Sequence, residues 1–200
     1  MLLNVGFAEA MKDFNFTCTI FHDIDLFPMN ETNLYNCPTR MPLHMSARVS
    51  TFAYKLPYPT IFGGVTALTR QHFEQVNGFS NMFWGWGGED DDMYNRVRDH
   101  GLDIARKPED GYYKMARHKA EVKNPDRRKM LNTGSQRCGF PMCIHVYHER
   151  CVSYHALHAI NTTSCKGVRV SAGFFLTLII GFHKKYFFLA STYFFAFYDT

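Results

Sequence analysis

Two aspartates, Asp23 and Asp25, directly follow the apolar segment 17–21 (TCTIF), whose β-branched and aromatic residues are typical of a buried strand. Because side chains alternate along a strand, residues two apart point to the same face, so both carboxylates can address one ligand. Two acids at the end of a strand suit a hard divalent cation that bridges a diphosphate. A solvated pair in a loop is the alternative, and the spacing alone leaves both open.

Four consecutive acids, at positions 89–92, follow a loop of two tryptophans and three glycines at 84–88 (WGWGG). The positive end of a helix dipole stabilises each such charge by roughly 0.3–1 kcal/mol, which predicts a helix over 89–100, with Gly101 just past its end. A well-capped helix start is one explanation of this block. The other is a sugar site, because tryptophan faces stack on sugar rings and a carboxylate can accept a proton from a hydroxyl group.

Met115 and His118 carry a thioether and an imidazole, which both bind metals. From their spacing alone, a core methionine beside a surface histidine is the favoured explanation. The segment 138–165 is rich in cysteine and histidine, but its spacings match no compact zinc pattern. A small zinc-binding membrane protein therefore remains a minor hypothesis.

The composition indicates a globular chain of 200 residues, with 46% hydrophobic and 20% charged residues. The net charge of +4 comes without a lysine/arginine tract, which argues against nucleic-acid binding. Three N-glycosylation sequons, at Asn15, Asn30 and Asn161, indicate a luminal protein. Residues 1–16 form neither a signal peptide nor an anchor and instead predict an amphipathic helix, so we expect a sequence truncated at its N-terminus.

Residues 17–137 read as mixed α/β, without an internal repeat. The segment 61–68 is interrupted by Gly63-Gly64, which predicts a close approach of the backbone to another group. A short helix is expected over 69–76, with Thr69 as N-cap. Residues 119–137 are polar and basic, which predicts a mobile loop. The apolar, aromatic segment 172–198 contains no uninterrupted stretch of the about 20 residues that a bilayer span requires.

Four blocks occur in order along the chain: FHDIDLFP (21–28), YPTIFGGVTAL (58–68), NGFSNMFWGWGGEDDDMYNRV (77–97) and MARH (115–118). In this order and spacing they resemble the β-1,4-galactosyltransferases of animals. The segment LLNVGFAEAMKDF (2–14) resembles the helix before the family's Asp-x-Asp strand. The resemblance implies an α/β, GT-A-like fold, of which 1–137 would be the C-terminal part of the catalytic domain. Residues 138–200 resemble nothing in the family and are expected to form an unassigned tail.

The resemblance also implies an activity and a compartment. Members are type II membrane enzymes of the Golgi lumen that use Mn²⁺ and a UDP-sugar. They transfer galactose or N-acetylgalactosamine, with inversion, to the 4-hydroxyl of a terminal N-acetylglucosamine or related sugar on a glycoprotein or glycolipid. By matching motif, Asp25, Met115 and His118 would ligate Mn²⁺, and Asp23 would contact the donor nucleotide.

Further roles come from the same family match. Asp90 would be the general base, Glu89 and Asp91 would hold the sugars, Trp86 would close over donor and acceptor, and Gly64 would lie where the acceptor approaches the backbone. Inversion by direct displacement requires a single base opposite the leaving diphosphate, together with a cation that stabilises the leaving group.

The remaining matches concern a disulfide, a loop and the donor. Cys18 and Cys37 match a family disulfide, and Arg127 falls near the acceptor-contacting part of the family loop that reorders when donor binds. Ile61 stands where galactose-transferring members have Tyr or Phe, so its smaller side chain predicts UDP-N-acetylgalactosamine as a good donor. The missing segments leave an alternative open: a catalytically inactive family product, or a membrane-associated binding remnant.

Overall fold

The computed structural model of the chain describes residues 2–107, 109–119, 121–137, 180–182, 185–190 and 193–198. The helices are α1 (Leu2–Asp13), the 3₁₀ turn η1 (Ser50–Phe52), α2 (Arg70–Gln75), α3 (Glu89–Asp99) and α4 (Arg127–Arg137). The strands are β1 (Cys18–Asp23), β2 (Leu26–Pro28), β3 (Leu43–His44), β4 (Arg48–Val49), β5 (Val65–Thr69), β6 (Ala105–Arg106), β7 (Tyr112–Met115), β8 (Ile180–Phe182), β9 (Lys185–Ala190) and β10 (Tyr193–Tyr198).

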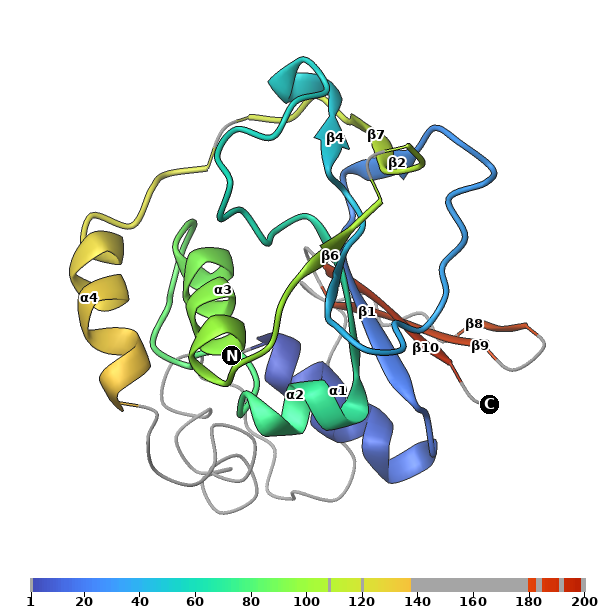
Figure 1. The fold of residues 1–200 in the computed structure, drawn as a ribbon, viewed down its shortest axis with the longest axis horizontal. Coiled ribbons are helices and arrows are strands. Elements are labelled where there is room, and N and C mark those ends of the chain that lie inside the picture. Colours follow the sequence, from blue (N-terminus) through green and yellow to red (C-terminus); the bar gives the residue numbers. More distant parts are fainter. Residues whose placement is uncertain are drawn as a thin grey trace, which may run out of the picture.

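The strands form two sheets. The larger sheet has the order β6-β3-β5-β1-β10-β9-β8, and the smaller one has the order β2-β7-β4. Strand β1 lies inside the large sheet, paired antiparallel with β5 on one side and with β10 on the other. Figure 1 shows the small sheet at the upper end of the molecule and α1 and α2 at the lower end. Strand β1 therefore ends beside the small sheet.

Strand β1 is buried on both faces, which explains its nearly continuous apolar sequence. Phe21 packs into a cluster with residues of α1, α2 and α3, among them Phe7 and Phe73. Ile20, which points to the other face, packs against residues of the small sheet such as Tyr113. The large sheet is thus covered by helices on one face and by the small sheet on the other, and both clusters hold the end of β1 in place.

The predicted helix ends agree with the structure. The Thr69 hydroxyl accepts a hydrogen bond from the backbone N–H of His72, as expected for the N-cap of α2. Helix α3 ends at Asp99, and Gly101 adopts a φ of 73°, the left-handed conformation that favours glycine after a helix. The N-terminal helix is also confirmed, as α1.

The interpretation of 119–137 as a mobile loop is wrong for its second half, which is α4. Figure 1 shows α4 beside α3, at the left of the molecule. The sequence contains a start signal for this helix. Asn124 and Pro125 precede the helix, and the Asn124 side chain accepts a hydrogen bond from the Asp126 N–H.

Cys18 and Cys37 are joined by a disulfide with a Cα–Cα distance of 5.6 Å. Of the residues that the structure describes, no helix is both long enough and apolar enough to cross a bilayer. The Cys/His segment 138–165 and the sequon at Asn161 lie outside the described residues. Strands β8, β9 and β10 come from the C-terminal segment, and β10 pairs with β1 along its whole length.

Candidate functional site

The proposed metal ligands come together where the two sheets meet. In the turn after β1, Asp25 accepts a backbone hydrogen bond from Ala116 at 2.7 Å, and Leu26 pairs with Met115 across β2 and β7. This pairing brings the end of β7 to the Asp-x-Asp turn. The Nε2 atom of His118 lies 3.0 Å from Oδ2 of Asp25.

The donor atoms of this group fit a divalent transition-metal ion. The Nδ1 of His118 lies 2.9 Å from the carbonyl oxygen of Lys119, and a bond there leaves Nε2 as the ligating atom on the side of Asp25. Among the described residues, no group of three or more His, Cys, Asp or Glu side chains could hold a metal. The thioether of Met115, a residue type outside that set, accepts a hydrogen bond from the Thr51 hydroxyl at 3.4 Å.

Negative charge is concentrated next to this pair. Burial raises the pKa of Asp23 well above its usual value, and the charges of Asp25, Glu89 and Asp90 add to the shift. Asp23 also lies at the end of β1, where its backbone N–H donates to the Gly64 carbonyl at 3.0 Å. A cation at Asp25 would lower the repulsion among these carboxylates, which supports the fit of a metal ion here.

The four acids at the start of α3 have different surroundings. Asp92 turns inward and pairs with Arg96 at 2.5 Å, both side chains being buried, so it serves the core. Asp91 accepts a hydrogen bond from the Tyr58 hydroxyl at 2.9 Å. Asp90 lies against Gly63, where an added Cβ atom would be 2.6 Å from Oδ2 of Asp90. Asp90 and Asp91 therefore face the segment 58–64, and Asp92 does not.

Burial makes Asp90 a weaker acid. It raises the pKa of Asp90 to about 7, and the charges of Glu89 and Asp91 contribute further. Burial also raises the pKa of Glu89, and Oε2 of Glu89 is buried without a hydrogen-bond partner among the described residues. A carboxyl group that titrates near neutral pH is suited to general base catalysis.

The aromatic loop before α3 is tied to the segment that leads into α4. Asn124 donates from its side-chain amide to the Trp84 carbonyl at 2.7 Å and from its backbone to the Trp86 carbonyl at 3.1 Å. The ring of Trp86 is half exposed, with the ammonium group of Lys123 5.6 Å from its centre. Arg127 packs against this loop, since a Cβ at Gly87 would lie 3.2 Å from its Cδ.

Two of the predicted site residues, Ile61 and Gly64, lie in the segment 58–64, just before β5. Gly64 has a φ of 80°, and an added Cβ would be 2.6 Å from the Ser46 hydroxyl, so close packing also requires glycine here. Ile61 is half-buried. Our sequence reasoning assigned no role to Tyr58 or Asn124, although Tyr58 lies within a block quoted above. Their contacts join distant parts of the chain, so no local signal reveals them.

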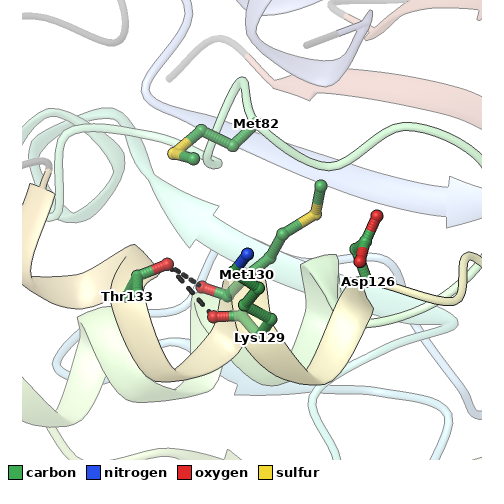
Figure 2. Close-up of a pocket in the computed structure, with 5 residues that line it drawn as sticks. All are labelled: Met82, Asp126, Lys129, Met130 and Thr133. Carbon is green, nitrogen blue, oxygen red and sulfur yellow. Dashed lines mark hydrogen bonds between the residues drawn. The ribbon is translucent and has the colours of Figure 1, made fainter.

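An open pocket lies beside α4, apart from the predicted site residues. Figure 2 shows the five residues that line it: Met82, Asp126, Lys129, Met130 and Thr133. The Thr133 hydroxyl donates to the carbonyl groups of Lys129 and Met130 within the helix, as the dashed lines show. The hydroxyl group of Thr133 is therefore already hydrogen-bonded within its own helix.

This fold is that of a glycosyltransferase domain. Residues 43–119 match the family model described as the N-terminal domain of galactosyltransferase, and residues 1–38 match the N-terminal region of glycosyl transferase group 7. The chain belongs to the β-1,4-galactosyltransferase family, and the expected α/β fold is confirmed.

Relatives support this assignment over part of their length. The chain is 43% identical to mouse β-1,4-galactosyltransferase 5 over 161 residues, which cover 79% of this chain and 41% of that protein. It is 48% identical to human β-1,4-galactosyltransferase 3 over 134 residues, covering 65% of this chain and 34% of the relative. The chain therefore spans about two fifths or less of the curated relatives it matches.

Solved structures agree with the sequence matches. The catalytic domain of Drosophila β1,4-galactosyltransferase 7 in complex with xylobiose superposes with a TM-score of 0.54 at 33% identity, covering 66% of this chain and 58% of that one. A mutant of that enzyme in complex with manganese, UDP-Gal and xylobiose gives a TM-score of 0.53 at 33% identity, with coverages of 65% and 58%.

Proposed function

We propose that this chain forms part of an inverting β-1,4-glycosyltransferase that transfers a sugar from a UDP donor. The observation that carries the proposal is the environment of Asp90, whose pKa is raised to about 7 where its carboxyl group packs against Gly63. A base that gains and loses its proton near neutral pH can accept the proton of an acceptor hydroxyl during displacement.

The other predicted site residues would bind the acceptor and the donor. The acceptor oxygen attacks the anomeric carbon, the bond to the diphosphate breaks, and the hydroxyl proton passes to Asp90. Glu89 and Asp91 would hold sugar hydroxyls, and the half-exposed Trp86 would cover them. Arg127 and Gly64 would contact the acceptor.

On the donor side, Asp25, Met115 and His118 would hold Mn²⁺, which supplies positive charge to the leaving diphosphate. Asp23 would contact the nucleotide. The concentration of acidic groups that raises the pKa of Asp23 supports a cation at this place. A relative solved with manganese and UDP-Gal supports the same donor class.

The substrates and compartment that we propose follow the family. The donor is UDP-galactose or UDP-N-acetylgalactosamine, and Ile61 favours the second because it leaves room for the acetamido group. The acceptor is a glycan ending in N-acetylglucosamine. The full-length protein would be a type II membrane protein of the Golgi lumen.

The test is a transfer assay with the 200-residue chain, with both UDP-sugars and an N-acetylglucosamine glycoside, in the presence of Mn²⁺ or of a chelator. We expect Mn²⁺-dependent transfer that Asp90→Asn lowers by about 10²- to 10⁴-fold. Asp25→Asn should weaken the binding of UDP with Mn²⁺, measured by calorimetry. Asp103→Asn is the matched control, because Asp103 is an exposed acid that pairs with Arg98 outside the site.

Two results would contradict the proposal. The first is transfer that neither chelation nor Asp90→Asn changes. The second is a folded chain that binds no UDP with Mn²⁺, which favours the alternative of a non-catalytic family product.

A further inference from the structure

The segment 58–64 carries three features of the proposed site on a stretch outside the helices and strands. Tyr58 donates to Asp91, Gly63 packs against Asp90, and Ile61 stands at the donor-selecting position. A segment without a strand partner has to be held by other groups if these contacts are to keep their geometry.

Arg106, on strand β6, binds two carbonyl groups of this segment. One terminal nitrogen of its guanidinium donates to the carbonyl of Pro59 at 2.8 Å and to that of Ile61 at 3.0 Å. A guanidinium presents five N–H donors in a planar fork, so it can bind these carbonyls and a third group at the same time.

The third group is His44, the register partner of Arg106 across β3 and β6. The Nε of Arg106 donates to Nδ1 of His44 at 3.2 Å, which makes Nδ1 the acceptor and leaves the imidazole proton on Nε2. That Nε2 lies 3.0 Å from the carbonyl oxygen of Gly63 and donates to it. Burial, followed by the charge of Arg106, lowers the pKa of His44 to about 4, which keeps the ring neutral and able to accept.

Ser46 is the third residue that binds a carbonyl group of segment 58–64. Its hydroxyl donates to the Gly63 carbonyl at 3.1 Å and accepts a hydrogen bond from the Val65 N–H at 2.8 Å. The carbonyls of three alternate residues, Pro59, Ile61 and Gly63, are therefore all bound by side chains of β6, β3 and the residues just after β3. We call Arg106, His44 and Ser46 the carbonyl clamp.

We infer that Arg106 is a positioning residue for the proposed transfer: through the carbonyl clamp it holds segment 58–64 against the carboxyl groups of Asp90 and Asp91. The kinetic consequences rest on the proposed function, whereas the clamp itself does not. Loss of the clamp lets Gly63 move away from Asp90 and lets Ile61 leave its place beside the donor. A displacement of about 1 Å at such a site lowers turnover by about 100-fold.

The experiment compares Arg106→Gln, Arg106→Lys and the control Arg70→Gln, which breaks an exposed ion pair on α2 with Glu74. The first readout, which needs no substrate, is hydrogen exchange of peptides covering 58–65. We expect exchange about tenfold faster there in Arg106→Gln, and unchanged exchange in α1 and α3. Lysine keeps the charge but not the planar fork of donors. Exchange at 58–65 in Arg106→Lys should therefore be faster than in the wild type and slower than in Arg106→Gln. Arg70→Gln should match the wild type.

The second readout is transfer from UDP-galactose and UDP-N-acetylgalactosamine. Arg106→Gln should lower kcat by about 10- to 100-fold, with a smaller change in KM, and should reduce the discrimination between the two donors. A purely structural role would lower the active fraction equally for both donors and leave their ratio unchanged. An unchanged ratio together with unchanged exchange at 58–65 overturns the inference.

The proposed function and the carbonyl clamp can be refuted independently of each other. If the wild type transfers neither sugar, the proposed function fails, and the exchange measurement still decides whether the clamp exists. If Arg106→Gln does not fold, Ser46→Ala takes its place, because it removes only the hydroxyl that binds Gly63 and Val65. Faster exchange confined to 58–65 in Ser46→Ala supports the clamp, and wild-type exchange there overturns it.

Discussion

Gly63 and Asp90 touch so closely that a Cβ atom at position 63 would lie 2.6 Å from Oδ2 of the aspartate. Glycine is therefore required at this position by the carboxyl group of another element. The same packing contributes to the burial that raises the pKa of Asp90 to about 7. The position and the acidity of the proposed base thus both depend on the segment before β5.

Gly63→Ala should displace the Asp90 carboxyl group. A contact of 2.6 Å is closer than real Cβ atoms tolerate, so the side chain or the segment has to move. We expect kcat to fall by about 10- to 100-fold, measured in the transfer assay. Gly101→Ala is the control, since open space surrounds Gly101 but its φ of 73° disfavours alanine. It should cost about 1 kcal/mol of stability and leave kcat unchanged; equal kcat in both variants would refute the prediction.

Asp90→Asn should stabilise the metal-free protein above neutral pH although it lowers transfer. The pKa of Asp90 is raised from 3.8 to about 7, so the folded state binds the proton more tightly than the unfolded state does. Its contribution to stability is therefore present below pH 3.8 and is lost as the pH rises to about 7. At roughly 1.4 kcal/mol per pKa unit, the variant should exceed the wild type by a few kcal/mol at pH 8.

The measurement is urea unfolding of both proteins at pH 8 and at pH 5 in the presence of a chelator. The advantage of Asp90→Asn should shrink at pH 5, where the wild-type carboxyl group is largely protonated in the folded state. Asp103→Asn, which removes an exposed charge of the same sign, is the control for the loss of a carboxylate. A variant less stable than the wild type at pH 8 would contradict the burial argument.

Ile61→Tyr should shift donor use toward galactose. The larger side chain occupies the space that the 2-acetamido group of N-acetylgalactosamine needs, whereas galactose has only a hydroxyl there. We expect the ratio of kcat/KM for UDP-N-acetylgalactosamine to that for UDP-galactose to fall by about tenfold or more, since steric exclusion of a few atoms is worth about 1–3 kcal/mol. Ile61→Val, which creates no new obstruction, should keep the ratio. If the wild type does not transfer N-acetylgalactosamine, the role proposed for Ile61 is wrong.

His44→Gln should change the pH dependence of stability on the acidic side. The pKa of His44 is lowered from 6.5 to about 4 in the folded state, so its contribution to stability is present above pH 6.5 and is lost as the pH falls toward 4. Glutamine keeps an amide donor for the Gly63 carbonyl but does not titrate. The stability difference between wild type and variant should therefore vary by about 3 kcal/mol across this window.

Urea unfolding at pH 7 and pH 4.5 measures that difference. His22 and His72, whose pKa values are also lowered by burial, are present in both proteins and cancel in the comparison. A difference that is the same at both pH values would show that His44 titrates normally and that the neutral ring of the carbonyl clamp is misassigned.

The local features of this protein could be predicted from its amino-acid sequence. The apolar run before Asp23 predicted β1, Thr69 predicted the start of α2, and the acids of 89–92 with Gly101 predicted both ends of α3. These signals are short-range, because strand alternation, capping and the helix dipole act within a few residues. The family could also be recognised from the sequence, because its motifs are contiguous blocks of residues.

The contacts between distant side chains could not be predicted from local sequence. The Asp25–His118 pair, the Tyr58–Asp91 hydrogen bond and the Gly63–Asp90 contact each join distant segments. Apart from the family match, position in the sequence does not separate Asp90 from Asp92, because both are acids of one helix start. One lies against segment 58–64 and the other pairs with Arg96 in the core. Burial and neighbouring charge, which set the acidity of a carboxyl group, come from packing between elements rather than from local sequence.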